Sequence, residues 1–185
     1  MKRFLLCLAM FPLTTALADH NGLLPRPQQL QYGSGTLKLQ GLSVRFASPP
    51  STEDWFAAEQ LASRLSAIGQ AKVEIKKGKS SRHAILLNRT GEAGALPADM
   101  ESPGPDSRES YTLRVTPEGA EIRGCSSAGV FYGVQTLLQM VEGTGTGAVL
   151  PVAEIKDWPA LAYRGVMIDF SEGELIRVSE AERQI

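Results

Sequence analysis

The chain has 185 residues, of which 43% are hydrophobic and 21% charged, proportions typical of a globular protein with one domain, or one domain and part of another. Its formal net charge is −1. Binding to nucleic acid regardless of base sequence, and binding to an anionic membrane surface, both require an excess of basic residues that this chain lacks. We therefore expect no nucleic acid and no membrane among its partners.

Residues 1–18 have the pattern of an export signal. Basic residues follow the initiating methionine, an apolar stretch comes next, and an Ala-Leu-Ala cleavage site ends at Ala18. A short membrane anchor is the alternative, but Pro12 interrupts the apolar run, which is shorter than the ~20 residues of a membrane-spanning helix. We predict cleavage near Ala18 and an exported protein, either periplasmic or secreted.

The cysteines exclude a disulfide framework. Cys7 would leave with the export signal, so Cys125 would be the cysteine of the mature chain. A lone cysteine in an exported protein is usually a small buried apolar residue, which is our prediction for Cys125. No His, Asp and Glu cluster has metal-ligand spacing, and no Gly-rich phosphate loop follows a predicted strand, so we expect no metal and no cofactor.

Two helices are predicted from their caps and their apolar spacing. The first spans residues 51–69, where Ser51 or Thr52 can cap the N-terminus and Gly69 suits the C-terminal end. The second runs from Ser126 or Ser127 to about residue 140 and has one apolar face. The apolar residues expected on the packed face of the first helix are Trp55, Ala58, Leu61, Ala62, Leu65 and Ile68.

Strand-like stretches surround these helices. Alternation of apolar and polar residues, with turn residues at the ends, identifies them. They lie at residues 36–39, 42–46, 72–75, 83–88, 111–115, 120–123 and 150–155, with another at 163–170. A polar Gly/Pro loop at residues 89–110 is long enough to be an insertion or a rim. The predicted fold class is α+β, a mostly antiparallel sheet with two helices on one face.

The order of these features resembles the N-terminal domain of the family-20 glycoside hydrolases, the β-N-acetylhexosaminidases. The opening arm and first strand of that domain are similar to LLPRPQQLQYGSGTLKL, and its hairpin and following helix to YTLRVTPEGAEIRGCSSAGVFYGVQTLLQM. Its junction with the catalytic barrel is similar to IKDWPALAYRGVMIDFS. The second stretch is specific, because hairpin, small residues and Phe-Tyr-Gly come in a fixed order. The resemblance covers nearly all of the mature chain.

The resemblance implies a division into three parts. After the signal peptide at residues 1–18, residues 19–157 would form the accessory domain, and residues 158–185 would begin a (β/α)8 catalytic barrel. The segment 163–170 would be its first strand, and Ser179 with Glu182 would form the capping box of the next helix. We interpret the chain as the N-terminal part of a larger enzyme; a natural stand-alone protein is the alternative.

For the whole enzyme, the resemblance implies removal of terminal N-acetylglucosamine or N-acetylgalactosamine from glycans or chitin oligosaccharides. The acetamido oxygen of the substrate attacks the anomeric carbon, a Glu acts as general acid and base, and a neighbouring Asp orients the acetamido group, which makes this family an exception among retaining glycosidases. No counterpart of that Asp-Glu pair is found here, and the acids of PADME and SEGEL read as solvated loop charges. We therefore expect no catalytic residue in this chain, which alone should be inactive.

Two residues match the family as sugar-binding candidates. Arg164, in the Tyr-Arg-Gly sequence, matches an arginine that grips hydroxyls at the non-reducing end, because a guanidinium offers several fixed donors. Its alternative role is pairing with a carboxylate at the domain interface. Asp169 matches an acid at the end of the first barrel strand and would organise the site. Where the family often has Ser-Arg-His, this chain has Ser171-Glu172-Gly173, so the subgroup and its substrate are not fixed.

Two functions from different classes follow. The first is the accessory domain of a hexosaminidase, completed by a catalytic barrel in the same polypeptide. The second is a stand-alone exported module that binds carbohydrate or a partner protein. The start of an apolar helix after a parallel-type strand favours the first, because a parallel strand needs neighbours on both sides.

Overall fold

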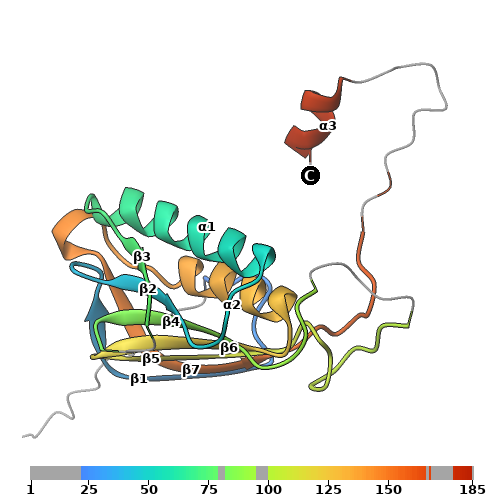
Figure 1. Ribbon diagram of the computed structural model, residues 1–185, viewed down its shortest axis with the longest axis horizontal. Coiled ribbons are helices and arrows are strands. Elements are labelled where there is room, and N and C mark those ends of the chain that lie inside the picture. Colours follow the sequence, from blue (N-terminus) through green and yellow to red (C-terminus); the bar gives the residue numbers. More distant parts are fainter. Residues whose placement is uncertain (1–21, 79–81, 95–99, 166, 168–176, 185) are drawn as a thin grey trace, which may run out of the picture.

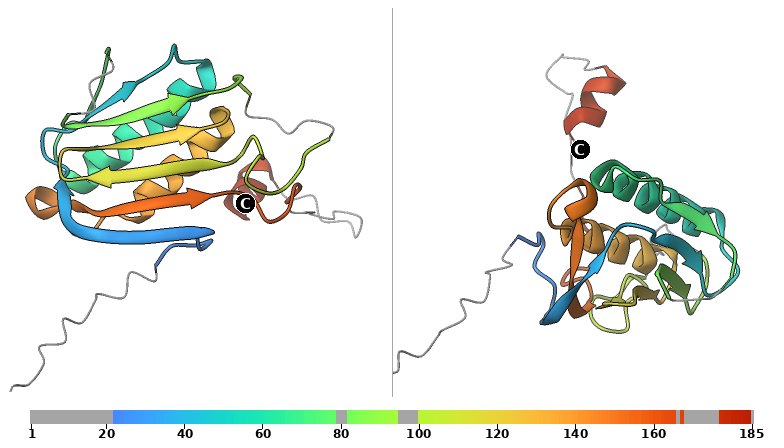
Figure 2. Two further views of the ribbon diagram at one scale, coloured as in Figure 1. Left: turned by 90° about the horizontal axis from the view of Figure 1, so that it is seen from below. Right: turned by 90° about the vertical axis from the view of Figure 1, so that its left-hand side faces the viewer.

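A seven-stranded sheet in the order β1-β7-β5-β6-β4-β2-β3 forms one layer of the protein. The computed structural model describes residues 22–78, 82–94, 100–165, 167 and 177–184. Helices α1 (Thr52–Gly69) and α2 (Ser127–Gln139) cover one face of the sheet, as predicted, and the other face is open (Figures 1 and 2). The strands are β1 (Gln29–Lys38), β2 (Ser43–Phe46), β3 (Glu74–Lys76), β4 (Ala84–Arg89), β5 (Tyr111–Thr116), β6 (Gly119–Gly124) and β7 (Val149–Asp157).

Strand directions divide the sheet into two halves. The pairs β1–β7, β5–β7 and β5–β6 are antiparallel, whereas β4–β6, β2–β4 and β2–β3 are parallel. The sheet is therefore mixed, and the prediction of a mostly antiparallel sheet was wrong. The reason is the crossover through α1, which returns the chain to the end of the sheet where β2 began, so that β3 runs parallel to β2.

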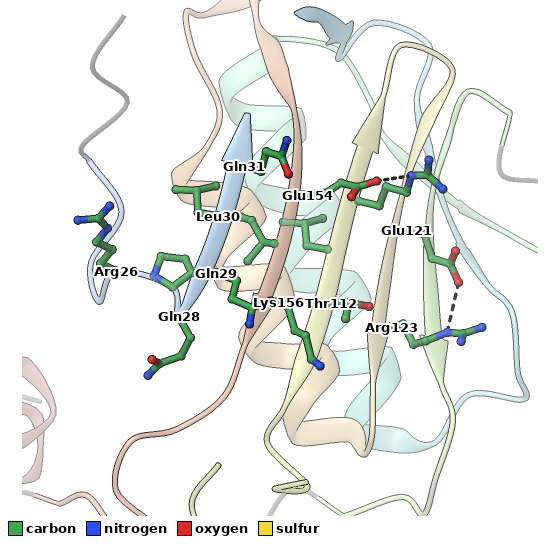
Figure 3. A pocket seen from close by; sticks show the side chains of 14 residues that line it. Arg26, Gln28, Gln29, Leu30, Gln31, Thr112, Glu121, Arg123, Glu154 and Lys156 are labelled. Atoms are coloured by element: carbon green, nitrogen blue, oxygen red, sulfur yellow. Dashed lines mark ion pairs between the residues drawn. The ribbon is translucent and has the colours of Figure 1, made fainter. Parts of the chain in front are cut away.

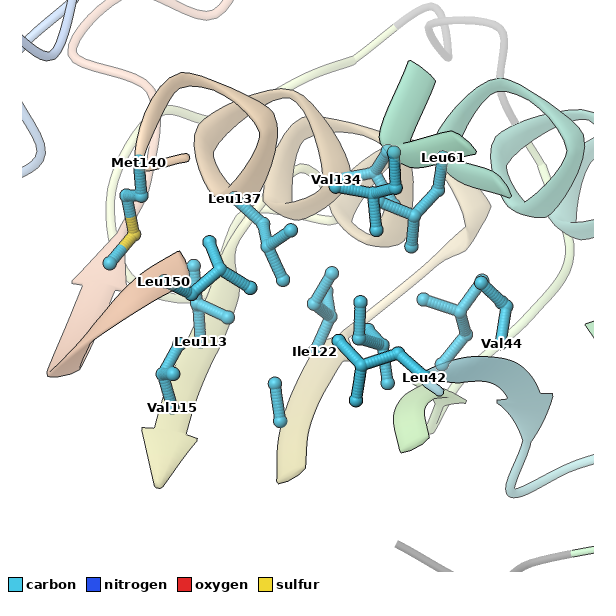
Figure 4. Packing of buried hydrophobic residues seen from close by; sticks show 14 of the residues in the cluster. Leu42, Val44, Leu61, Leu113, Val115, Ile122, Val134, Leu137, Met140 and Leu150 are labelled. Carbon is cyan, nitrogen blue, oxygen red and sulfur yellow. The ribbon is translucent and has the colours of Figure 1, made fainter. Parts of the chain in front are cut away.

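The core lies between the sheet and the two helices (Figure 4). In strand β5, the alternation of apolar and polar residues determines which side chains enter the core. Tyr111, Leu113 and Val115 are buried, and the residues between them face the open side of the sheet. Leu61 of α1 and Leu137 of α2 lie over this face with no exposed area. Further members of the same cluster are Val44, Leu65, Ile85, Leu87, Ile122, Val134 and Leu150.

Both helices begin at the serines that the sequence offers as caps. The hydroxyl of Ser51 accepts a hydrogen bond from the Asp54 N–H at 3.2 Å, and the Asp54 carboxylate accepts one from the Ser51 N–H at 3.0 Å, which completes a capping box. Ser126 caps α2 by accepting from the Ala128 N–H at 3.1 Å. Trp55 departs from the prediction: it is 42% exposed and packs edge-on against Phe46, 5.0 Å between ring centroids.

Helix α2 approaches the β5–β6 hairpin through glycines. A Cβ on Gly129 would lie 2.4 Å from the backbone oxygen of Ser110, and one on Gly124 would lie 2.4 Å from the Val130 nitrogen. A Cβ on Gly133 would lie 2.4 Å from Cγ2 of Ile122. These glycines, one at the end of β6 and two in the first half of α2, are therefore required for close packing of helix on sheet.

Other predictions have mixed outcomes. Cys125 is exposed, and the prediction that it is buried was wrong, because it lies in the short connection between the end of β6 and the start of α2. A third helix, α3 (Val178–Gln184), forms where a helix was expected after the barrel strand. The export signal lies outside the described residues and is not tested. Half of the predicted barrel strand, residues 166 and 168–170, also lies outside them, and the described residues 163–165 and 167 are not in a strand, so the start of a barrel is not confirmed. Within the described residues, no helix has the length and apolar character needed to cross a membrane.

Candidate functional site

Arg164, the predicted sugar-binding arginine, lies just beyond β7 and is held by the domain. One terminal nitrogen of its guanidinium pairs with the Glu109 carboxylate and lies 3.4 Å from the Tyr132 hydroxyl. The other donates to the Leu161 carbonyl at 2.7 Å. The guanidinium carbon also lies 5.8 Å from the centroid of the Tyr132 ring, a cation–π distance. The guanidinium is therefore engaged on several sides by this domain.

The electrostatics of the pair follow from its burial. The Glu109 side chain is 11% exposed, whereas that of Arg164 is 42% exposed. The hydrogen bond to Glu109 raises the pKa of Arg164, and partial burial opposes this shift. Arg164 thus has a carboxylate partner within this domain, whereas its role at a domain interface is not tested. Asp169 lies outside the described residues, so sugar contact by Asp169 or Arg164 stays a prediction.

A pocket of about 480 Å³ lies beside Arg164, between α2, the N-terminal arm and the segment after β7. Tyr132 and Trp158 provide aromatic surface, and Gln135 and Gln139 provide amides from α2. The remaining lining residues are Pro25, Arg26, Gln28, Glu109, Tyr111, Thr136, Asp157, Pro159, Ala160, Leu161 and Arg164. Hydrogen bonds fix its walls: the Gln139 side chain accepts from the Leu24 N–H at 2.9 Å and donates to the Leu24 carbonyl at 3.1 Å.

An apolar groove lies on the outer side of the helix layer and shares Tyr132 with this pocket. It measures about 490 Å³ and runs between the N-terminal ends of α1 and α2. Phe56 of α1 stacks on Phe131 of α2 at 6.0 Å between centroids, and Phe131 meets Tyr132 edge-on at 5.9 Å. Phe56 is 53% exposed and Tyr132 38% exposed. Tyr132 therefore lies between the two hollows and lines both of them.

The open face of the sheet carries a third hollow, about 1070 Å³ in volume and lined by charged and amide side chains (Figure 3). Arg114 pairs with Glu154 at 3.1 Å, and Arg123 lies 3.9 Å from Glu121. These side chains are exposed, and the described lining contains no aromatic ring that could stack on a sugar. The hollow has the character of a solvated sheet face.

Two acidic residues of the Gly/Pro loop have partners that the sequence did not reveal. Glu101, which the sequence suggested was a solvated loop charge, has a side chain only 7% exposed and pairs with Arg108. Glu109 pairs with Arg164, 55 positions away. No local periodicity could reveal either pair. Among the described residues, no group of three or more His, Cys, Asp or Glu could hold a metal ion.

Comparison with known proteins decides the family. Residues 20–158 match the model of the family described as "Glycosyl hydrolase family 20, domain 2". The chain belongs to glycosyl hydrolase family 20. The resemblance to family 20 is thereby confirmed: the match includes the first two of the three sequence stretches and the start of the third, up to residue 158.

Curated family-20 relatives are much longer than this chain. The β-hexosaminidase of Porphyromonas gingivalis is 33% identical over 155 residues, which are 80% of this chain and 18% of that protein. The N,N'-diacetylchitobiase of Vibrio harveyi is 29% identical over 148 residues, 80% of this chain and 15% of that protein. The chain thus spans less than a fifth of the length of these relatives.

Solved family-20 structures share the fold. The chitobiase of Flavobacterium johnsoniae superposes with a TM-score of 0.66 at 25% identity, over 82% of this chain and 23% of that one. An exo-β-N-acetylglucosaminidase of Vibrio harveyi, solved with N-acetylglucosamine, gives a TM-score of 0.63 at 21% identity, over 89% of this chain and 23% of that one. At that identity the second likeness concerns the fold alone.

Proposed function

We propose that this chain is the accessory domain, with the first part of the catalytic barrel, of an exported exo-acting β-N-acetylhexosaminidase. The observation that carries the proposal is the family-20 match over residues 20–158, together with relatives that are named β-hexosaminidase or chitobiase. The substrates would be glycans or chitin oligosaccharides that end in N-acetylglucosamine or N-acetylgalactosamine.

In this proposal, the chemistry comes from the barrel. Hydrolysis would retain the anomeric configuration, with the acetamido group of the substrate as nucleophile and a barrel Asp-Glu pair that this chain does not supply. Asp169 would organise the sugar site from the end of the first barrel strand. No cofactor or metal is part of the mechanism, and the chain alone would not hydrolyse substrate.

The accessory domain would brace and shield the barrel. The surface that supports this role is the aromatic groove of Phe56, Phe131 and Tyr132, which shares Tyr132 with the pocket near Trp158. Exposed aromatic surface rimmed by polar side chains is typical of a face that another domain covers. The segment after β7 leaves the domain beside this surface, so a barrel built on it would begin next to the groove.

The first test is an activity assay on the purified chain, produced in a host that lacks its own hexosaminidase. We expect no release of 4-nitrophenol from 4-nitrophenyl N-acetyl-β-glucosaminide above the blank. Turnover would contradict the prediction that the Asp-Glu pair is absent. A matched preparation of an intact family-20 enzyme shows that the assay works.

The second test is the genomic DNA beyond codon 185. We expect an open frame of several hundred further codons that encodes an Asp-Glu pair on a later barrel strand. A polypeptide expressed from the whole frame should then hydrolyse the same substrate. A stop codon directly after Ile185 would instead favour the stand-alone binding module, and glycan arrays would be the next experiment.

A further inference from the structure

Basic side chains lie along the β3 edge of the sheet, opposite the edge that β1 forms (Figure 2). Lys76 ends β3 and Lys77 follows it, and both are exposed. We give the name basic edge to the side chains of Arg45, Lys72, Lys76, Lys77 and Arg82. Residues 79–81 lie outside the described residues and are not part of this surface.

Strands β2 and β3 bring three members of the basic edge together. Arg45 lies opposite Lys76 in the parallel register of the two strands. The preceding pair, Val44 and Ile75, packs into the core, so Arg45 and Lys76 point to the open face of the sheet. The Arg45 guanidinium also donates to the Lys77 carbonyl at 2.7 Å and thereby ties the end of β3 to β2.

The backbone places Arg82 at the start of β2 and β4. His83, the next residue, has a φ of 49° and leads directly into β4. Its carbonyl accepts a hydrogen bond from the Ser43 N–H at 3.3 Å, and its N–H donates to the Glu118 carbonyl at 2.7 Å. These two hydrogen bonds hold the chain beside the first residue of β2, two positions from Arg45.

Glu74 only partly offsets the positive charge of the basic edge. Its two carboxylate oxygens lie 3.3 Å from the Lys72 ammonium and 3.4 Å from the Lys76 ammonium. Hydrogen bonds from Lys72 and then Lys76 lower the pKa of Glu74, so its carboxylate is ionised at neutral pH. Among the described residues, no other carboxylate forms an ion pair with the basic edge. Positive charge is therefore in local excess, although the whole chain has a net charge of −1.

The surroundings of the basic edge favour a soluble anionic polymer as its partner. Peripheral binding to a membrane combines basic side chains with inserted apolar ones, and single-stranded nucleic acid stacks on aromatic rings. The large apolar side chains exposed among the described residues lie elsewhere; Trp55 and Phe56, for example, are at the N-terminal end of α1. Clustered lysines and arginines without such side chains are typical of surfaces that bind heparin-like polyanions.

We propose that the basic edge binds the sulfate and carboxylate groups of an anionic polysaccharide. The choice of a polysaccharide rests on the proposed function, since a hexosaminidase acts on glycans, whereas the charged surface does not rest on it. Strands β5, β6, β4 and β2 separate β7 from β3, and at about 4.8 Å per strand this is a distance of about 24 Å. The basic edge would therefore hold the polymer well away from the chain end on which the barrel acts.

Binding of the purified full chain to a fluorescent heparin oligosaccharide tests the proposal without any activity assay. Fluorescence anisotropy gives the dissociation constant between about 50 and about 200 mM NaCl. We expect binding that weakens steeply as salt rises. Hyaluronan, which carries carboxylates but no sulfates, should bind more weakly. Neutral chitin oligosaccharides should not compete with heparin.

Lys76→Gln combined with Lys77→Gln removes two cations from exposed positions. We expect the affinity for heparin to fall about ten-fold at low salt, and the slope of log affinity against log salt to fall by about two, because fewer counterions are released. Glu74→Gln removes the acid of this edge and should raise the affinity by about three-fold. A rise in affinity cannot come from loss of folding.

Arg114→Gln combined with Lys156→Gln is the matched control. It removes the same charge from β5 and β7, which β6, β4 and β2 separate from β3. We expect little change in the affinity for heparin. Equal losses in the two double variants would overturn the proposal, because binding would then follow net charge and not the basic edge.

Absence of heparin binding at about 50 mM NaCl would also overturn the proposal. So would tighter binding to double-stranded DNA, or to vesicles of phosphatidylglycerol, than to heparin, because the partner would then bear phosphate. The hexosaminidase proposal is judged by hydrolysis of its own substrate, so failure of either proposal can be recognised separately.

Discussion

The carboxylate of Asp157 accepts a hydrogen bond from the backbone N–H of Gln28 at 3.0 Å, across 129 positions of sequence. Its other oxygen accepts from the Tyr111 hydroxyl at 3.0 Å, and that hydroxyl lies 2.5 Å from the Thr136 hydroxyl of α2. The last residue of β7 therefore joins the N-terminal arm, β5 and α2 at one point. Because Asp157 and the residues directly after it line the pocket beside Arg164, this point supports one wall of that pocket.

Removing this carboxylate should loosen both the arm and the pocket wall. Asp157→Ala loses two hydrogen bonds and leaves the buried Tyr111 hydroxyl with fewer partners, so we expect the free energy of unfolding to fall by about 2 kcal/mol. Asp157→Asn keeps one acceptor oxygen and should lose about half as much. Urea denaturation measures both, with Asp106→Ala, at an exposed position, as the control. Equal stability of Asp157→Ala and the unaltered chain would contradict the role given to this contact.

The approach of α2 to the sheet makes Gly129 intolerant of a side chain. In Gly129→Ala the new Cβ would lie 2.4 Å from the Ser110 oxygen, a backbone atom that cannot move without displacing the end of the Gly/Pro loop or the helix. We expect a loss of about 3 kcal/mol or more, or failure to fold. Gly133→Ala meets a side-chain methyl of Ile122 and should cost less. In Gly147→Ala the Cβ has nothing within 4 Å, so thermal denaturation should show little change in this control.

Asp54 joins the cap of α1 to strand β4 by an ion pair. Its Oδ2 atom accepts from the Arg89 guanidinium at 2.9 Å, and its side chain is nearly buried. Asp54→Ala removes the carboxylate half of the capping box and leaves Arg89 without this partner, so the expected loss is about 3 kcal/mol. Glu59→Ala, at an exposed position of the same helix, is the control.

A double variant separates the cap from the buried charge. Arg89→Met with Asp54→Ala removes both charges, so its loss should be smaller than the sum of the two single losses. Additive losses in chemical denaturation would mean that the pair contributes no coupling and that only the cap matters.

Local chemistry explains which features the sequence predicts well. The N-caps at Ser51 and Ser126 are confirmed because a cap depends on hydrogen bonds within three residues. The β5–β6 hairpin is confirmed because its turn and alternation lie within one short stretch. The family resemblance used the same stretch, since its small residues are the ones that let α2 approach the hairpin.

Features that depend on distant partners were missed. Strand β1 begins at Gln29, seven positions before the predicted start at residue 36, because its first residues pair with the end of β7, where Gln29 lies opposite Lys156. The parallel half of the sheet depends on which strand each crossover returns to, and the alternation of apolar residues does not encode this. The partner of Glu109 is equally remote in sequence, and only the folded chain brings it to Arg164.

Alkaline pH should test the buried Tyr111. Burial, chiefly, raises the pKa of its phenol well above the value of about 10 expected in the unfolded chain, and the nearby Asp157 carboxylate adds to the rise. Below pH 10 the phenol is protonated in both states, so its contribution to stability is fully present. Above pH 10 the unfolded state releases the proton and the folded state keeps it, so stability falls as pH rises, by up to about 1.4 kcal/mol per unit.

Tyr111→Phe removes this titration. The variant should be less stable at neutral pH, because the hydrogen bonds to Asp157 and Thr136 are lost, yet its stability should fall less steeply between about pH 10 and 11.5. Burial also raises the pKa of Tyr32, so some slope should remain, and Tyr32→Phe serves as the comparison. Urea midpoints across this range give the slopes. If stability falls equally steeply with pH in Tyr111→Phe and in the unaltered chain, the Tyr111 phenol has the same pKa in the folded and the unfolded state. That result would contradict the rise in pKa expected from its burial.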